Sequence, residues 1–376
     1  MADSELNYLS LEEQLNRLRQ AIDDIDGKIL DLLNQRAKVA QDVGKVKNHH
    51  ETEYYIPSRE KAVMKRLREK SAGPLPGDAI ESIFREVISA CRALETNLHI
   101  AYLGPAGSYH HCAAQAHFGR SPEFIPTDTI RGVFHEVECR RVEYGVVAIE
   151  NSIEGSVGQT LDYLAHSNNH VVGEIYFPIS HNLISQSELH EIERVYAHPQ
   201  ALAQCRNWLE SNLPNAQQVD ASSNTAGVKR CQDDPRSAAI ASRVAAEMFE
   251  VPIQVYGIED FAGNTTRFFV IGSEPMSPSG DDKTSMVVFL RDQVGALYSM
   301  LEPFKSHSIS LTNIVSRPTK QEAWQYMFFL ECKGHIEDES LKKAMDDIKD
   351  SSLYLKILGS YPHAHIVKKD AASNLA

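Results

Sequence analysis

The sequence predicts a multidomain protein with an all-helical part, an α/β part and an α+β part, in that order. An apolar ladder with 4-3 spacing near the N-terminus is typical of one long helix. From residue 98, short apolar runs alternate with helical patterns, which indicates a mostly parallel sheet covered on both faces. After residue 283, a β-α-β-β-α-β rhythm is typical of a ferredoxin-like unit. The length of 376 residues is also too great for one ordinary hydrophobic core.

Composition and charge exclude several classes of function. The 42% hydrophobic and 24% charged residues are typical of a globular protein in water, and no apolar run is long enough to span a membrane. A formal net charge of -13 argues against a nucleic-acid-binding surface over the whole chain, although it is compatible with a local basic pocket. The N-terminal residues lack a signal-peptide core, and the 6 cysteines follow no disulfide-framework spacing. We therefore expect a cytoplasmic protein with reduced thiols.

Three helices are expected in residues 1–97. The longest should run from about residue 10 to residue 48, a second should follow Pro57, and a third should begin near Asp78. A helix so much longer than its partners cannot cover its own apolar seam, which predicts pairing with a second copy of the chain. The apolar residues of this seam are Leu11, Leu15, Leu18, Ile22, Ile25, Ile29, Leu32, Val39, Val43 and Val46.

Arg36 interrupts the seam, and Lys47 lies on the same face almost three turns further on. Burying a guanidinium is costly unless an anion meets it. Two interpretations remain open from the seam alone: a pocket for an acidic small molecule, or a register-setting polar residue that pairs with a carboxylate inside a bundle. Glu95 continues the apolar stripe of the third helix. It is either a partly buried carboxyl that stays protonated and donates a hydrogen bond, or a solvated helix end.

The run LRQAIDDIDGKILDLLNQRAKVAQDVGKVK (18–47), followed by PSRE (57–60), resembles the all-helical chorismate mutase family. The resemblance implies an intertwined helical dimer with two shared active sites. The catalytic residues that it assigns to each site are Arg19 from the partner chain, Arg36, Lys47, Arg59, Glu60 and Glu95.

By that resemblance, the three arginines hold the substrate's carboxylates, Lys47 and Glu95 meet the breaking ether oxygen, and Glu60 meets the ring hydroxyl. The chemistry agrees with such a set, because a Claisen rearrangement needs neither a nucleophile nor a proton transfer. It needs a dianion held in a compact chair and stabilisation of the negative charge that develops on the ether oxygen.

Residues 98–275 resemble prephenate dehydratase, which implies a two-lobed α/β fold like that of periplasmic binding proteins. The motifs that support this resemblance are GPAGSYHH (104–111), ENSIEGSVGQTLD (150–162) and NTTRF (264–268). Thr266 is implied as the catalytic hydroxyl that assists departure of the ring hydroxyl, and Arg267 as the group that orients a substrate carboxylate. The implied substrate-binding residues are Ser108, Asn151, Ser152, Thr160, His181, Gln204, Ser222 and Phe268.

The implied dehydratase chemistry calls for no cofactor. Loss of CO2 and hydroxide from prephenate yields an aromatic ring, so the site needs only to bind two carboxylates and to donate a proton to the leaving group. The histidines and the cysteine within residues 110–117 could suggest zinc, but their spacing does not match a tetrahedral ligand set. We therefore expect neither a metal nor an electron-carrying cofactor, and we interpret these residues as one helix face near a polar cleft.

A polar linker at residues 273–283 leads into residues 283–363, which resemble an ACT domain, a small-molecule regulatory module. The implied effector is phenylalanine, bound between paired domains. Val315 stands where the motif of this family has Glu, and a dimerisation module without a ligand is the alternative. Residues 364–376 are expected to form a disordered tail. The implied allosteric residues are Gly295, Ala296, Leu297, Ser316, Arg317 and Pro318.

Together, the three resemblances imply a bifunctional enzyme of phenylalanine biosynthesis. It would rearrange chorismate to prephenate, convert prephenate to phenylpyruvate, respond to phenylalanine as a feedback inhibitor, and work as a homodimer or larger homo-oligomer. One alternative, a fusion of the mutase to prephenate dehydrogenase, would need a dinucleotide-binding fingerprint, and GPAGS is a poor substitute for one. A second alternative makes the central domain a non-catalytic sensing module, because Ala197 and the GPAGSYHH loop depart from the dehydratase pattern.

Overall fold

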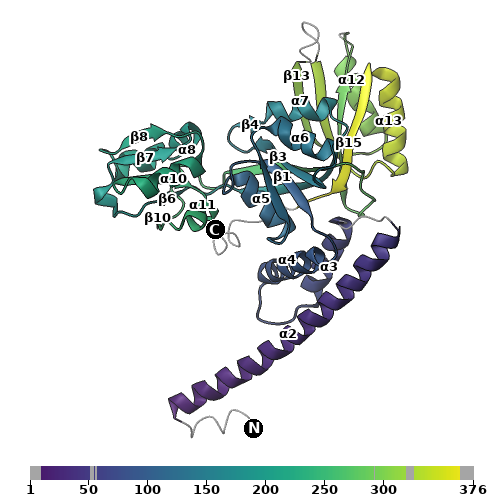
Figure 1. Ribbon diagram of the computed structural model, residues 1–376. Helices are drawn as coiled ribbons and strands as arrows, with labels where there is room; N and C mark the ends of the chain where they lie inside the picture. Colours follow the sequence, from purple (N-terminus) through teal and green to yellow (C-terminus); the bar gives the residue numbers. More distant parts are fainter. Residues whose placement is uncertain (1–9, 51–54, 56, 292, 319–325, 365–376) are drawn as a thin grey trace.

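The computed structural model describes residues 10–50, 55, 57–291, 293–318 and 326–364. The chain forms a helical part, a two-lobed middle part and a C-terminal part, as Figure 1 shows. The expected disordered tail lies outside the described residues, apart from Ala364. Within the described ranges, every helix is too short or too polar to cross a lipid bilayer.

Three helices form the N-terminal part, with bounds close to those expected: α2 (Leu11–His50), α3 (Pro57–Lys70) and α4 (Gly77–Ala93). Pro57 is the first residue of α3, where its missing N–H costs no hydrogen bond. The 40 residues of α2 give it a length of about 60 Å at a rise of 1.5 Å per residue. The C-terminal half of α2 lies beside α4, whereas its N-terminal half projects away from the rest of the molecule (Figure 1).

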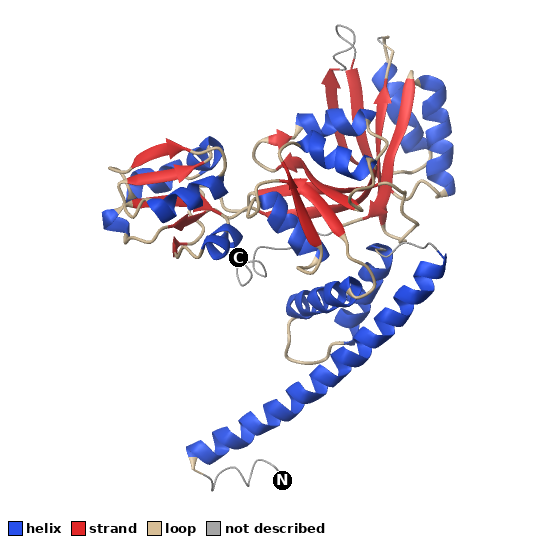
Figure 2. Ribbon diagram, viewed as in Figure 1, coloured by secondary structure: helices blue, strands red, loops and turns tan. Residues whose placement is uncertain are grey.

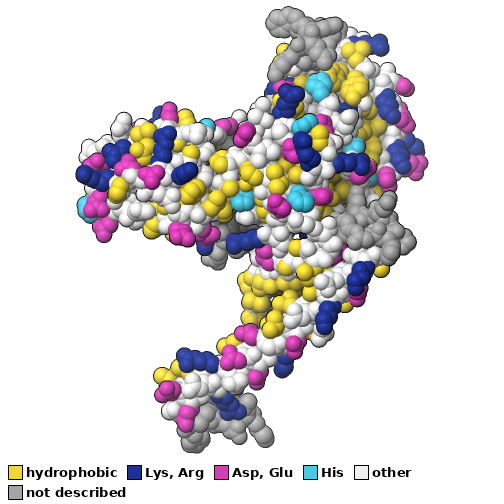
Figure 3. All heavy atoms as spheres, in the orientation of Figure 1, with side chains coloured by type: hydrophobic (Ala, Val, Ile, Leu, Met, Phe, Trp, Pro, Cys, Tyr) yellow, Lys and Arg dark blue, Asp and Glu magenta, His cyan; other side chains and the backbone are white. Residues whose placement is uncertain are grey.

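The apolar seam of α2 is uncovered in the single chain. Leu18, Ile22 and Ile25 are 55%, 57% and 53% exposed. Figure 3 shows apolar side chains gathered where α2 approaches α4. An uncovered stripe of this length is unfavourable in water, and a second copy of the helix would cover it.

Two separate groups of strands form the two lobes of the middle part (Figure 2). The elements of the first lobe are β1 (His99–Leu103), α5 (Tyr109–Phe118), β2 (Glu123–Thr127), α6 (Ile130–Glu138), β3 (Tyr144–Asn151), β4 (Gly155–Ser156), α7 (Gly158–His166), β5 (His170–Pro178) and β11 (Thr265–Gly272). The elements of the second lobe are β6 (Asn182–Ile184), η2 (Leu189–Glu191), β7 (Arg194–Ala197), α8 (Pro199–Gln204), α9 (Arg206–Asn212), β8 (Gln217–Asp220), α10 (Asn224–Asp233), β9 (Ser237–Ala241), α11 (Arg243–Phe249) and β10 (Ile253–Val255).

Each lobe has a mixed sheet, which corrects the expectation of a mostly parallel one. The first sheet has the order β2-β1-β3-β11-β5, with β4 paired to β3, and the second has the order β10-β6-β9-β7-β8. In the first sheet, β11 is antiparallel to both β3 and β5, whereas β1 is parallel to β2 and β3. The physical reason is the connection between the lobes. The chain leaves the first lobe after β5 and comes back from the second lobe as β11, so β11 must run in the opposite direction.

The C-terminal part is the expected ferredoxin-like unit. Its four-stranded antiparallel sheet has the order β13-β14-β12-β15, which places the first and third strands in the middle. α12 and α13 pack together on one face of this sheet, around a core that includes Met300 and Ile348. The elements are β12 (Asp282–Phe289), α12 (Ala296–Ser306), β13 (Leu311–Pro318), β14 (Tyr326–Lys333), α13 (Glu339–Ser351) and β15 (Tyr354–Pro362).

The first lobe and the C-terminal part share one hydrophobic core. Phe269 of β11 belongs to the same buried cluster as Phe329 of β14 and Leu358 of β15. At Gly359, the backbone of β15 comes so close to the Val171 carbonyl group on β5 that an added Cβ atom would collide with it. The two sheets are therefore tightly joined.

Two candidate active sites and a regulatory face

A cleft of about 530 Å³ lies between the two lobes of the middle part. The carboxyl ends of β1 and β3, the start of β11 and the N-termini of α5 and α10 all reach it. Ser108 caps α5 by accepting a hydrogen bond from the His111 N–H, and Ser223 caps α10 in the same way through the Ala226 N–H at 3.0 Å. Helix N-termini favour negative charge, so this cleft suits an anionic ligand.

A chain of hydrogen bonds crosses the cleft and starts at Thr266. The Asn151 amide donates to the Thr266 hydroxyl at 2.8 Å and to the Asn264 side-chain oxygen at 2.9 Å. The Asn264 amide in turn lies 3.4 Å from the Gln204 side-chain oxygen, which is 2.8 Å from His181 Nε2. The first lobe supplies Thr266 and Asn151, and the second lobe supplies Gln204. The chain therefore fixes the Thr266 hydroxyl relative to both walls of the cleft.

His181 is held on its other side by Tyr109, whose hydroxyl lies 2.9 Å from His181 Nδ1 and donates to the Ser180 carbonyl at 2.7 Å. Burial lowers the pKa of His181, although hydrogen bonding to Gln204 and the charge of Glu259 oppose that shift. His181 is therefore a neutral, oriented imidazole in the cleft. Gln204 also donates to Glu154 at 3.2 Å, which brings a carboxylate to the cleft edge.

Most of the predicted dehydratase residues come together here. Two of the predicted substrate-binding residues do not line the cleft, and neither does Arg267. Ser152 acts from its edge, where its hydroxyl donates to Asn264 at 3.4 Å and accepts from the Thr265 N–H at 3.0 Å. Thr160 is fully buried, and its hydroxyl donates to the Ala148 carbonyl at 2.6 Å, so this position contradicts its expected substrate contact. The predicted residues that line the cleft are Ser108, Asn151, His181, Gln204, Ser222, Thr266 and Phe268.

Arg267 lies outside the cleft, which corrects the role expected for it. Successive side chains of a strand point to opposite faces, so Arg267 points away from the face on which Thr266 and Phe268 line the cleft. Arg267 is 5% exposed, and its guanidinium forms ion pairs with Glu174 at 2.6 Å and with Glu331 at 2.7 Å. In this arrangement it cannot orient a substrate carboxylate.

The histidines of α5 are neutral residues packed near the cleft. Burial lowers the pKa of His110 to about 4 and the pKa of His117 to about 3. His110 lines the cleft beside Phe268, with its ring at 5.1 Å from that phenyl group, and its Nε2 has no hydrogen-bond partner among the described residues. No group of three or more potential metal ligands occurs in the described part of the chain.

The second candidate site lies where α2, α3 and α4 meet. Lys47 forms an ion pair with Glu95 at 3.4 Å, and both side chains are mostly buried. The Arg36 guanidinium donates to the Val87 carbonyl at 3.4 Å. Glu95 lies just beyond the end of α4 and is held there by a backbone hydrogen bond to Arg92. Of the two interpretations of Glu95, the structure therefore favours a partly buried carboxyl, although it lies outside the helix proper.

Glu60 is a second, half-buried carboxylate of this site, with a side chain that is 24% exposed. Burial raises the pKa of Glu60, and the charges that oppose the shift are, in decreasing order, those of Arg92, Arg85, Lys47 and Arg36. Arg36, Lys47 and Glu60 are therefore close enough to interact, as the resemblance implied. Arg19 and Arg59 are exposed in the single chain. Arg19 is 17 residues before Arg36, or about 25 Å along the helix, so it can join such a site only from a partner chain.

Arg92 is a residue of this site that the sequence analysis missed. It is 5% exposed and pairs with Glu60 at 2.6 Å. Its guanidinium also lies over the ring of buried Tyr55, 5.0 Å from the centroid, and the Tyr55 hydroxyl bonds to His117. The signal was present in the sequence, since Arg92 follows Ile88 by one turn in the apolar stripe of α4. The same argument had singled out Arg36.

The predicted regulatory residues lie on two adjacent parts of the C-terminal unit. Gly295 is the N-cap residue of α12 and has a φ of 85°, a conformation that glycine adopts readily, whereas Leu297 within the helix is 43% exposed. On β13, Ser316 and Pro318 are exposed, whereas Arg317 pairs with Asp162 of α7 at 3.0 Å. Ala296 is half-buried and packs against the core of the unit. Val315, in the place of the expected Glu, packs against the shared core.

Comparison with known proteins finds matches to three families in order along the chain. These are Chorismate mutase type II at residues 18–96, Prephenate dehydratase at residues 100–276 and the ACT domain at residues 284–350. A protein of Aquifex aeolicus described as "Bifunctional chorismate mutase/prephenate dehydratase" is 44% identical over 357 residues, which are 94% of this chain and 99% of that protein. A protein of Stutzerimonas stutzeri with the same description is 42% identical over 363 residues, 95% of this chain and 100% of that protein.

Solved structures also resemble the part of the chain that follows the helical segment. The crystal structure of a prephenate dehydratase from Arthrobacter aurescens, in complex with L-Phe, matches with a TM-score of 0.66 and 30% identity. The match covers 74% of this chain and 97% of that one.

Proposed function

The chain belongs to the family of bifunctional chorismate mutase/prephenate dehydratases, and from this premise we propose where each reaction takes place and which residues perform it. Chorismate is rearranged to prephenate in the helical part, residues 1–97. Prephenate is converted to phenylpyruvate in the cleft of residues 98–275. Residues 283–363 form the regulatory ACT domain.

In the mutase site, Arg36 binds a carboxylate of the substrate dianion, Lys47 and Glu95 meet the ether oxygen, and Glu60 meets the ring hydroxyl. The reaction needs only a compact substrate conformation and fixed charges at the ether oxygen. The contact between Lys47 and Glu95 at 3.4 Å supports this arrangement, because it brings together the two groups that the resemblance places at the ether oxygen. The cation that a single chain lacks there is Arg19 of the partner subunit.

The enzyme is therefore a homodimer in which each mutase site takes residues from both chains. The exposed seam of α2 supports this proposal, because two such seams cover each other when the helices pair. Arg59 is exposed in the single chain and would be enclosed at the same interface.

In the dehydratase site, the Thr266 hydroxyl assists the departure of the ring hydroxyl while the helix N-termini of the cleft bind carboxylates. The observation that supports this most is the hydrogen bond from Asn151 to Thr266. The amide N–H donates, so the threonine oxygen accepts, and the proton of the hydroxyl stays available for the leaving group. Loss of CO2 and of the ring hydroxyl makes the ring aromatic, which supplies the driving force.

Phenylalanine is the effector that we assign to the ACT domain. The similarity to a prephenate dehydratase crystallised with L-Phe supports this assignment. The candidate contacts are Gly295, Ala296, Leu297, Ser316 and Pro318. Val315 is packed inward, so its replacement of a carboxylate changes the core more than the exposed face of β13.

The cytoplasm is the compartment that we propose for this enzyme. All 6 cysteines are free thiols, and 5 of them are buried, which supports a reducing environment.

A coupled assay of the full chain tests the dehydratase assignment. With chorismate as substrate, the unmodified protein should form prephenate and then phenylpyruvate. Thr266→Val should keep the formation of prephenate and lower the formation of phenylpyruvate by about a hundredfold or more, since the loss of a general acid costs 10²- to 10⁴-fold.

Thr265→Val is the matched control for that assay. It removes a neighbouring hydroxyl that donates to the Gly263 carbonyl, and both activities should stay close to normal. Undiminished phenylpyruvate formation by Thr266→Val would remove the role of this hydroxyl. If the unmodified protein forms prephenate only, the central domain is the non-catalytic sensing module.

A further inference from the structure

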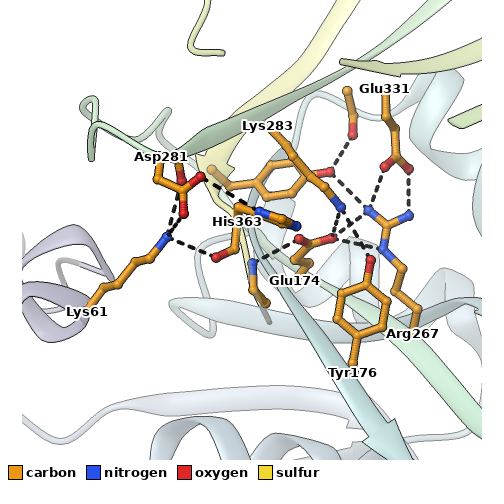
Figure 4. A network of polar contacts seen from close by, with 11 residues as sticks. Lys61, Glu174, Tyr176, Arg267, Asp281, Lys283, Glu331 and His363 are labelled. Atoms are coloured by element: carbon orange, nitrogen blue, oxygen red, sulfur yellow. Dashed lines mark hydrogen bonds and ion pairs between the residues drawn. The ribbon is translucent and has the colours of Figure 1, made fainter. Parts of the chain in front are cut away.

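Figure 4 shows a buried cluster of four charged residues around Arg267, whose side chain points to the face of β11 opposite the one that lines the cleft. We call Glu174, Arg267, Lys283 and Glu331 the interdomain charge cluster. Arg267 donates to Glu174 at 2.6 and 2.9 Å and to Glu331 at 2.7 and 2.8 Å, and Lys283 donates to Glu174 at 3.1 Å. All four residues are between 3% and 7% exposed. Two cations thus meet two carboxylates out of contact with water.

The cluster joins the dehydratase sheet to the regulatory sheet. Arg267 and Glu174 come from β11 and β5, whereas Lys283 and Glu331 come from β12 and β14. The Tyr361 hydroxyl on β15 adds a contact to Arg267 at 3.4 Å and bonds to Ser285 of β12 at 2.6 Å. The Arg267 guanidinium therefore binds carboxylates from both sheets.

Such a cluster is poorly explained by stability alone. Moving charges out of water costs free energy that their mutual attraction only partly returns, so apolar residues could fill this space at least as well. A guanidinium bound by two carboxylates does fix their relative positions, because its planar set of N–H donors can bond to carboxylates only within a narrow range of positions. The cluster thus fixes the position of β11 relative to β14.

Both ends of this connection reach a functional residue. Arg267 directly follows Thr266 on β11, so any shift of its backbone moves the hydroxyl in the cleft. Glu331 is paired in register with Asn313 of β13, the strand that also bears Ser316. One strand, β14, therefore separates the guanidinium from the strand that we assign to the effector site.

We propose that Arg267 is a positioning residue for Thr266, and that its ion pair with Glu331 makes this position depend on the state of the ACT domain. The second half of the proposal rests on phenylalanine as effector, as assigned above. A shift of β14 that lengthens or breaks the pair lets β11 move and takes the hydroxyl out of alignment.

Glu331→Gln in the full chain tests the proposal, because it removes one charge of the pair and preserves the shape of the side chain. With prephenate as substrate, kcat should fall about ten- to a hundredfold, as expected for a misplaced catalytic group. KM should stay within about twofold, because Arg267 does not line the cleft. The phenylalanine concentration for half inhibition should rise about tenfold or more, whereas binding of phenylalanine, measured by calorimetry, should persist.

Two further variants make the test specific. Arg267→Lys keeps the charge but cannot bridge two carboxylates, so its kcat and inhibition should lie between those of the unmodified protein and Glu331→Gln. Lys61→Met is the matched control: Lys61 of α3 also crosses a domain boundary, to Asp281 at 2.7 Å and to the His363 carbonyl, but it does not touch the cluster. Both dehydratase kcat and inhibition should be unchanged in it. Mutase activity measured on each sample shows that the helical part is folded, and an unchanged thermal unfolding transition shows that the other two parts are folded.

Several results would overturn the proposal. Unchanged kcat and inhibition in Glu331→Gln would show that the ion pair transmits nothing, and a raised KM at normal kcat would place Arg267 in contact with substrate. Loss of phenylalanine binding would make Glu331 part of the effector site. If Glu331→Gln lacks mutase activity, Arg267→Lys decides by the same measurements. An unmodified protein that is neither bound nor inhibited by phenylalanine would refute the effector assignment itself, which is a distinct failure.

Discussion

At the scale of single residues, Arg92 shows how one buried cation affects the pKa of a neighbouring carboxylate. Among the charges that oppose the raised pKa of Glu60, that of Arg92 has the largest effect. Arg92→Met removes that charge, so the pKa of Glu60 should rise further and the carboxylate should become protonated at a higher pH. The acid limb of the mutase kcat profile should therefore move to higher pH, while the dehydratase profile stays in place.

Arg92→Lys is the control for this prediction, because it keeps a positive charge near Glu60. Its acid limb should lie between those of Arg92→Met and the unmodified protein. An unchanged acid limb in Arg92→Met would mean that Glu60 is not the group whose ionisation limits the mutase reaction.

The sequence allowed the middle site to be predicted in large part, because motif residues such as Asn151, Gln204 and Thr266 do meet in one cleft. The errors have physical causes. Alternation along a strand places Thr266 and Arg267 on opposite faces, whereas the motif resemblance implies that both contact substrate. The partner of Thr160 is a backbone carbonyl brought near by tertiary packing, and side-chain type alone does not reveal such a bond.

At the scale of elements, the contact between β15 and β5 should be the most sensitive point of the joint between the sheets. Gly359→Ala places a methyl group against the Val171 carbonyl, where the backbone cannot yield without separating the strands. We expect a loss of about 1–3 kcal/mol in the free energy of unfolding, as for an overpacked core, measured by denaturant titration.

Gly73→Ala is the matched substitution elsewhere, because a Cβ atom at Gly73 would meet nothing within 4 Å. It should leave the free energy of unfolding within about 0.5 kcal/mol of the original value. Equal stability of the two variants would mean that β15 can move away from β5 at little cost.

Element boundaries in the helical part were predictable because local signals determine them. Pro57 begins α3, and the breaker run before Asp78 separates α3 from α4. The direction of β11 was not predictable in the same way. It depends on the chain crossing to a second lobe and returning, and the short apolar run of β11 contains no local signal of this connection.

At the scale of the whole molecule, pairing of α2 between two chains should determine mutase activity but not dehydratase chemistry. Ile25→Glu places a charge in the exposed seam and should prevent the helices from pairing. Mutase kcat/KM should fall about a hundredfold or more, because the site loses the partner's arginine, whereas conversion of prephenate should persist. Sedimentation analysis should show a weakened dimer.

Gln20→Glu is the matched control for this prediction, since Gln20 lies on the other face of α2 and bonds to Asp24 of the same helix. It adds the same charge outside the seam and should leave mutase activity within about twofold. Full mutase activity in Ile25→Glu would instead mean that one chain builds the site alone.

The core shared by the first lobe and the C-terminal unit has a practical consequence for anyone who recombines these enzymes. Cutting the chain in the 273–283 linker would expose the apolar surfaces around Phe269 and Phe329 to solvent, and both fragments would tend to aggregate. A chimaera that takes its ACT domain from a relative must therefore also take the face of the first lobe that packs against that domain. The regulatory domain and the catalytic lobe have to be exchanged together.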